Sequence, residues 1–212
     1  MKRPATLVAT IAAVVALAGV AMADEVVWRT LAIRGVADAS IEVPDFMKEV
    51  VAAEKSAKGA QVKTLFVAIG IDQMGGQLFC ALSRQFYAHD KRNLTAVQSQ
   101  ELTASQLTND PGIACGISRV PDGKYEQNAR IAGGFAAASC VTIYIDPDNK
   151  NKDTRVIESN TMIAAPRYFY RFVCTDDVAR DVRVEVGEKF VWDQELKGQV
   201  THMVDSLKLP TR

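Results

Sequence analysis

Tyr168-Phe-Tyr-Arg-Phe-Val-Cys-Thr175 is the stretch that most clearly indicates the fold of this chain. Its residues alternate in character, and an extended strand points successive side chains to opposite faces of a sheet. One face would carry Tyr168, Tyr170, Phe172 and Cys174. Aromatic side chains at these positions favour packing against neighbouring strands and a core. The stretch therefore predicts a strand with one buried face.

Similar strands are predicted on the N-terminal side of this stretch, separated by turn residues. Asp72–Gly76 reads as a turn, so the apolar segments before and after it should form a hairpin. The predicted strands are Val26–Val36, Ser40–Val43, Val62–Ile71, Leu78–Tyr87, Ala137–Ile145 and Arg155–Ala164.

Three helices are predicted from caps and helical spacing. Asp45 would cap a helix that ends near Gly59, and Thr103 with Gln106 forms a capping-box pattern at a short helix over Thr103–Asn109. Asp193 would cap a third helix that runs to about Leu207 and must dock through one apolar stripe. That stripe consists of Leu196, Val200, Met203, Val204 and Leu207. The expected class is α+β: an antiparallel sheet of about six or seven strands, with helices on both sides.

The N-terminus has the layout of a secretory signal peptide. Lys2 and Arg3 precede an apolar run over Ala5–Met22, which ends in the small-x-small pattern Ala21-Met22-Ala23. A retained membrane anchor is the alternative interpretation. We expect residues 1–23 to be cleaved and residues 24–212 to form one domain without a stable membrane anchor. The bacterial periplasm or the outside of the cell is the expected location.

The charge balance argues against nucleic acid as a partner. The 212 residues include 25 basic and 25 acidic ones, and cleavage would remove Lys2 and Arg3. The exported part would be slightly acidic, so it has no basic surplus with which to hold phosphates or anionic lipid.

Four cysteines remain after the signal, at Cys80, Cys115, Cys140 and Cys174. An even number in an oxidising compartment predicts two disulfides. Four cysteines allow three pairings. Cys80–Cys115 and Cys140–Cys174 are favoured because these pairs close the smaller loops, but the sequence leaves the other pairings open.

Several segments, in this order, resemble the PsbP-like fold, the α/β/α sandwich of the photosystem II extrinsic subunit P. The Ran-binding nuclear-import factor and several bacterial periplasmic proteins share that fold. The matching segments are Ala39–Phe46, Glu101–Leu107, Ile131–Ala136, Tyr168–Phe172 and Asp205–Pro210. The resemblance covers most of the exported part. It implies an assembly factor, chaperone or extrinsic subunit that needs no catalytic residue.

A second resemblance involves one segment. Phe79-Cys-Ala-Leu-Ser-Arg-Gln85 is similar to a stretch of the invasion-associated locus B family, whose members are exported and carry cysteines. That family has a further Cys after a Trp shortly upstream, and this chain has neither there. The similarity implies a secreted protein that contacts a host as one alternative function.

Residues capable of catalysis are sparse. The two histidines, His89 and His202, have no metal ligands at helical spacing, and Ser83 and Ser118 lack a nucleophile motif. The acidic run over Asp146–Asp153 lacks the glycine of a calcium loop. No catalytic residue, metal or cofactor is expected.

Two classes of function follow. The first is a non-enzymatic accessory protein that binds an envelope or secreted protein. The second is a small-ligand carrier or an enzyme with an arginine-lined anion site. The arginines that could clamp an anion or contact a partner are Arg84, Arg119, Arg167 and Arg171.

Overall fold

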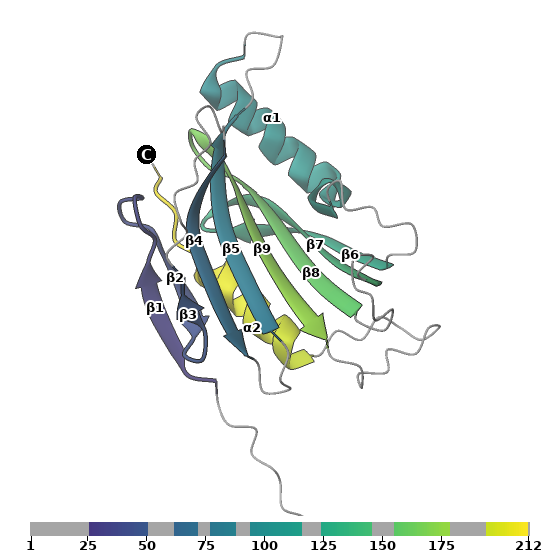
Figure 1. Ribbon diagram of the computed structural model, residues 1–212. Coiled ribbons are helices and arrows are strands. Elements are labelled where there is room, and N and C mark those ends of the chain that lie inside the picture. Colours follow the sequence, from purple (N-terminus) through teal and green to yellow (C-terminus); the bar gives the residue numbers. More distant parts are fainter. Residues whose placement is uncertain are drawn as a thin grey trace, which may run out of the picture.

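Seven strands form one antiparallel sheet in the part of the chain that the computed structural model describes, residues 26–50, 62–71, 77–87, 94–115, 124–145, 155–178 and 194–211 (Figure 1). The strands are β1 (Trp28–Ala32), β2 (Ser40–Pro44), β3 (Lys48–Glu49), β4 (Val62–Ile71), β5 (Gln77–Phe86), β6 (Lys124–Ala132), β7 (Phe135–Ile145), β8 (Arg155–Ala164) and β9 (Tyr168–Val178). The order across the large sheet is β3-β4-β5-β9-β8-β7-β6, while β1 and β2 pair separately. The predicted α+β class is confirmed.

The main core lies on one face of this sheet, which we call the inner face. Phe66, Leu82 and Phe172 lie directly opposite one another on β4, β5 and β9, and each is at most 2% exposed. Tyr170 and Cys174 share this face and are also buried. The alternation of Tyr168–Thr175 therefore predicted the buried side of the central strand β9 correctly.

The inner face is covered by helix α2 (Gln194–Ser206) together with β1 and β2 (Figure 1). All five residues of the predicted helical stripe are buried in the core beneath α2. Ser206 connects the two covering elements, because its hydroxyl accepts a hydrogen bond from the backbone N–H of Glu42 at 3.0 Å. The proposed cap Asp193 lies outside the described residues.

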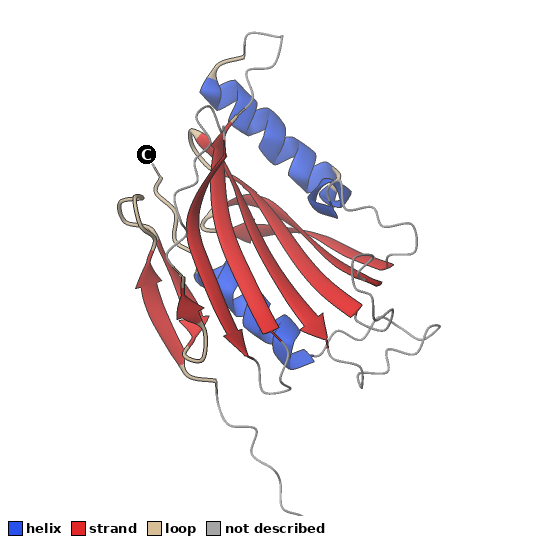
Figure 2. Ribbon diagram, viewed as in Figure 1, coloured by secondary structure: helices blue, strands red, loops and turns tan. Residues whose placement is uncertain are grey.

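Helix α1 (Ala96–Asn109) lies on the opposite face, which we call the outer face (Figure 2). It packs on β7 and β8 with the short 3-10 helix η1 (Pro111–Cys115). The predicted helix is present but starts earlier, since Thr95 and Gln98 form the capping box. The Thr103 hydroxyl instead donates to the carbonyl of Ser99 inside the helix at 2.8 Å. Helices on both faces make the predicted sandwich.

The prediction of a helix that begins at Asp45 is wrong for the first residues of that segment. Lys48 and Glu49 form β3, and the N–H of Val50 donates to the carbonyl of Val67 on β4 at 2.8 Å. Gly70 makes this pairing possible, because a Cβ there would come within 2.7 Å of the Phe46 ring. Strand pairing has overridden helical spacing at this point. Residues 51–59 lie outside the described residues.

Strand β6 was not predicted from the sequence. It pairs with β7 at one edge of the sheet and carries Glu126, Asn128 and Arg130 toward the inner face. An edge strand with polar side chains lacks the apolar alternation by which buried strands are recognised.

The predicted disulfide pairing is wrong, although all four cysteines are paired. Cys80 bonds Cys174 across β5 and β9 in the inner core, and Cys115 of η1 bonds Cys140 of β7 on the outer face. Nearness in sequence was a poor guide, because β5 and β9 are neighbours despite a separation of 94 residues.

Peptide mapping under non-reducing conditions tests this correction. It should recover peptides that join Cys80 to Cys174 and Cys115 to Cys140. Replacing either pair by alanines should lower the free energy of unfolding by roughly 2–5 kcal/mol, with the larger loss for Cys80 and Cys174, which close the longer loop. Recovery of a peptide joining Cys80 to Cys115 would contradict the structure.

A second expected outcome concerns the turn between β6 and β7. Gly133 and Gly134 both have positive φ, +58° and +84°, and a Cβ at Gly133 would lie 3.1 Å from Leu209. Replacing either glycine by alanine should lower the free energy of unfolding by roughly 1–2 kcal/mol, because alanine is strained in a left-handed backbone conformation. Gly133→Ala should lose more in urea unfolding, because Leu209 must also move. Equal losses would show that Leu209 does not pack tightly on the turn.

Candidate functional site

The outer face of the sheet is only partly covered by described elements. α1 and η1 lie over β6, β7 and β8, where Leu107, Ala138 and Ala164 form a small second core. Apart from the end of the sheet near Gln85 and Phe169, no described helix lies over β4, β5 and β9 on this side (Figure 1). We call this uncovered part the open face. It consists of Val67, Ile69, Phe79, Ala81, Glu158, Asn160, Arg171 and Val173.

The apolar residues of the open face lie in two cross-strand rows. Val67, Ala81 and Val173 form one row, while Ile69 and Phe79 pair in the next. Phe79 is 38% exposed, and the other four apolar residues are half-buried. Apolar side chains placed side by side in solvent gain free energy when another surface covers them.

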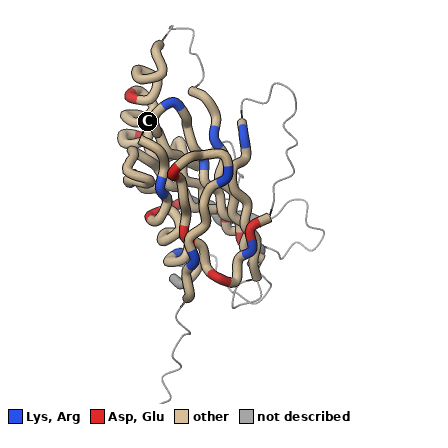
Figure 3. The backbone as a smooth tube through the Cα atoms, turned by 90° about the vertical axis from the view of Figure 1, so that its left-hand side faces the viewer, with Lys and Arg blue, Asp and Glu red and all other residues tan. Residues whose placement is uncertain are grey.

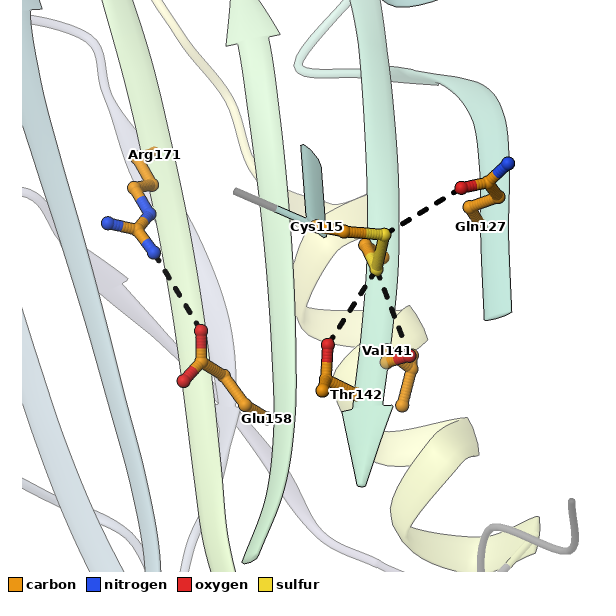
Figure 4. The surroundings of a disulfide bond; sticks show 7 residues. Cys115, Gln127, Val141, Thr142, Glu158 and Arg171 are labelled. Atoms are coloured by element: carbon orange, nitrogen blue, oxygen red, sulfur yellow. Dashed lines mark hydrogen bonds and ion pairs between the residues drawn. A yellow bond between two sulfur atoms is a disulfide. The ribbon is translucent and has the colours of Figure 1, made fainter. Parts of the chain in front are cut away.

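A polar cluster adjoins these rows. Arg171 of β9 donates from Nε to Oδ1 of Asn160 on β8 at 2.9 Å. Its Nη2 lies 3.7 Å from Oε1 of Glu158 (Figure 4). Asn160 is only 3% exposed, and its Nδ2 has no hydrogen-bond partner among the described residues. The Arg171 side chain remains 42% exposed, so its guanidinium can still reach a ligand.

The Cys115–Cys140 disulfide borders the polar cluster. Cys140 lies directly opposite Asn160 on β8. Its disulfide to Cys115 holds η1 against the sheet beside the open face (Figure 4). A covalent bond at this position limits how far η1 can move over Asn160. The disulfide therefore makes this edge of the open face rigid, and a binding surface is more precise when it is rigid.

A shallow cavity of about 210 Å³ lies where the open face meets α1. Gln85 and Phe169 line it from the sheet, and Gln106 and Leu107 line it from the helix. Tyr87 also lines it, but its hydroxyl donates to the carbonyl of Ala165 at 2.8 Å. Burial raises the pKa of Tyr87, so this hydroxyl stays protonated and is a structural hydrogen-bond donor.

Of the four arginines proposed from the sequence, the three that the structure describes are not brought together. Arg171 belongs to the open face, but Arg84 lies on the inner side, where its guanidinium stacks 4.4 Å from the centre of the Tyr168 ring. Burial raises the pKa of nearby Tyr170, and the positive charge of Arg84 partly offsets this rise. Arg167 is exposed in the turn before β9, and Arg119 lies outside the described residues.

Other sequence candidates have structural partners. The His202 ring stacks on Trp28 with centroids 3.9 Å apart, and its Nε2 lies 2.6 Å from Oε2 of Glu42. Ser83 donates to the carbonyl of Arg171. His89, Ser118 and the acidic run over Asp146–Asp153 lie outside the described residues.

Sequence reasoning missed exposed Phe79 and the two partners of Arg171, half-buried Glu158 and buried Asn160. Glu158 and Asn160 share the outer side of the predicted strand Arg155–Ala164, and a search for charges complementary to Arg171 could have found Glu158. The exposure of Phe79 has no signal in the sequence, because it depends on where α1 ends.

Charges elsewhere are mixed. Seen from the side of β1 and β2, acidic and basic positions are interspersed along the described backbone (Figure 3). Within the same residues, no three His, Cys, Asp or Glu side chains are placed to hold a metal ion. None of the described helices is long and apolar enough to cross a bilayer.

Comparison with known proteins yields matches in structure only. No protein-family model matches the sequence, and no curated protein matches it. Yeast Mog1p, described as a Ran-binding protein of Saccharomyces cerevisiae, superposes with a TM-score of 0.51 at 9% identity, over 87% of this chain and 96% of its own.

Two further solved structures are similar. LpqN of Mycobacterium tuberculosis, described as involved in cell envelope biogenesis, has a TM-score of 0.43 at 13% identity over 89% of this chain and 88% of its own. The cyanobacterial PsbP of Synechocystis has a TM-score of 0.44 at 12% identity over 92% and 99%. At 9% identity the superposition on Mog1p shows the fold alone. The chain has the PsbP-like fold that its sequence predicted.

Proposed function

We propose that this chain is an exported, non-enzymatic accessory protein of the bacterial envelope that binds another protein through the open face. The observation that carries the proposal is the exposure of Phe79 beside half-buried Val67, Ile69, Ala81 and Val173. A sheet face with this composition resembles the core of a protein interface more than ordinary surface.

Arg171 supplies the polar part of the proposed contact. Arginine is common among residues that dominate binding energy, and its guanidinium here is held at one edge by Asn160 and Glu158. Because these partners fix its orientation, Arg171 loses little conformational entropy when it meets a carboxylate or a backbone carbonyl of the partner.

Export is supported by two independent features. The first is the layout of the N-terminus, with Lys2, Arg3 and the motif Ala21-Met22-Ala23. The second is that all four cysteines are paired in disulfides, which persist in oxidising compartments.

The fold also serves protein binding in Mog1p, described as a Ran-binding protein.

A site-specific photo-crosslinker tests the proposed contact. With benzoylphenylalanine in place of Phe79, irradiation of cells that make the protein should give a discrete protein adduct, because the side chain would be covered by the partner. Phe86 is the matched control, since it lies on the same strand and is more exposed, at 63%, but is not part of the open face. Equal adducts at both positions, or none at Phe79, would contradict the proposal.

Arg171→Ala provides a second expected outcome once the partner has been identified. The affinity should fall by about tenfold or more, as expected when an arginine that contacts the partner is lost from an interface. Arg84→Ala is the control, because Arg84 lies on the inner side over Tyr168. The affinity can be measured by calorimetry. A fall that is as large for Arg84→Ala would place the contact elsewhere.

A further inference from the structure

A second and larger cavity, of about 290 Å³, lies between α2 and the strands β6, β7 and β8. It is on the inner face of the sheet, so the sheet itself separates it from the open face. Unlike the core beside it, this cavity is lined mainly by polar side chains. The polar lining arises from a change in residue type across the strands of the sheet.

The inner face changes from apolar to polar along one cross-strand row. From β4 the row begins with Phe66, Leu82 and Phe172, and it continues with Thr161, Ser139 and Asn128 toward the edge strand β6. Ser139 and Thr161 lie 2.7 Å apart through their hydroxyl oxygens. Ser159, at 5% exposure, adds another hydroxyl to the cavity wall. Ser139 and Ser159 therefore give the floor of the cavity its hydroxyl groups.

Helix α2 follows the same change. Its buried stripe covers the apolar half of the sheet, while Lys197, Thr201 and Asp205 recur at intervals of four residues along the side that faces β6. Lys197 Nζ lies 2.8 Å from Oε1 of Glu126. Arg130 forms an ion pair with Asp205. These two ion pairs bridge α2 and β6, one on each side of Thr201 and Asn128.

The position of Asn128 gives the cavity an entrance. Asn128 is exposed on the edge strand, between Glu126 and Arg130, and it lines the cavity together with Thr201 of the helix. A molecule entering there would pass between the two ion pairs. It would reach the hydroxyl floor and the apolar side chains of Val141 and Val200.

The geometry points to a binding site for a small, uncharged polyhydroxy compound of the monosaccharide type. Sugar hydroxyls both donate and accept hydrogen bonds, and the wall offers an accepting carboxylate on Glu126, a donating ammonium on Lys197, and an amide and hydroxyls that do both. Val141 and Val200 can cover the C–H face of a sugar ring.

A neutral ligand fits better than an anion. Both cations of the site already pair with carboxylates, Lys197 with Glu126 and Arg130 with Asp205. An anion would have to displace these carboxylates, whereas a hydroxyl can share a cation with its existing partner. The volume lies near the lower limit of ligand sites, about 300–1,000 Å³, which suits one sugar unit.

Saturation-transfer NMR on the protein produced from the full 212-residue chain tests the site. The probes are glucose and N-acetylglucosamine. Inorganic phosphate is the anionic comparison, and its binding is followed by the broadening of its phosphorus NMR line because it has no C–H protons. At least one sugar should bind. Asn128→Trp should weaken its binding by about tenfold or more, because the indole fills the entrance and the amide is lost.

Gln127→Trp is the matched control. Gln127 is the exposed neighbour of Asn128 on the same edge strand, but its side chain points to the outer face. This variant should bind the sugar within about twofold of the original protein. Circular dichroism shows whether each variant is folded; if Asn128→Trp does not fold, Asn128→Ala replaces it and should also weaken binding.

Three results would overturn the proposal: no binding of either sugar, binding of phosphate without binding of sugar, or equal loss in both tryptophan variants. The site is independent of the proposed protein contact. Asn128→Trp should leave photo-crosslinking from position 79 unchanged, so failure of one proposal can be distinguished from failure of the other.

Discussion

The two-residue period of strand β9 is the constraint on which the rest of the structure depends. Tyr170, Phe172 and Cys174 must point to one side and Arg171 and Val173 to the other. β9 lies at the middle of the sheet, so its register fixes which residues of β5 and β8 share a face. A shift by one residue would bury Arg171 and expose three core side chains. The main core and the open face therefore have one common origin.

The buried strands and helix α2 could be predicted from the sequence, whereas the strands at the edges of the sheet could not. The aromatic alternation of Tyr168–Thr175 and the apolar stripe of α2 are strong because burial demands them. Strand β6 escaped prediction because its inward side chains are polar. The residues after Asp45 were misread because pairing with β4, a distant part of the chain, decides their conformation.

The candidate site was harder to predict than the fold, for a related reason. Arg171 was found in the sequence, but its partners Asn160 and Glu158 lie on another strand. Phe79 became a candidate only once the length and direction of α1 were known, since any strand phenylalanine could equally be covered. Likewise, the cysteine partners depend on strand order, which local patterns do not contain.

The pairing of β5 with β9 has a consequence for the time at which the chain can fold. Neighbours in the middle of the sheet are separated by nearly half of the sequence, and α2, which closes the core over them, follows both. Contacts between such distant residues make folding slow, because a long loop must close before they contribute. A ribosome must therefore have released most of the chain before a stable core can form. The newly made polypeptide thus stays unfolded for longer than one built from local contacts.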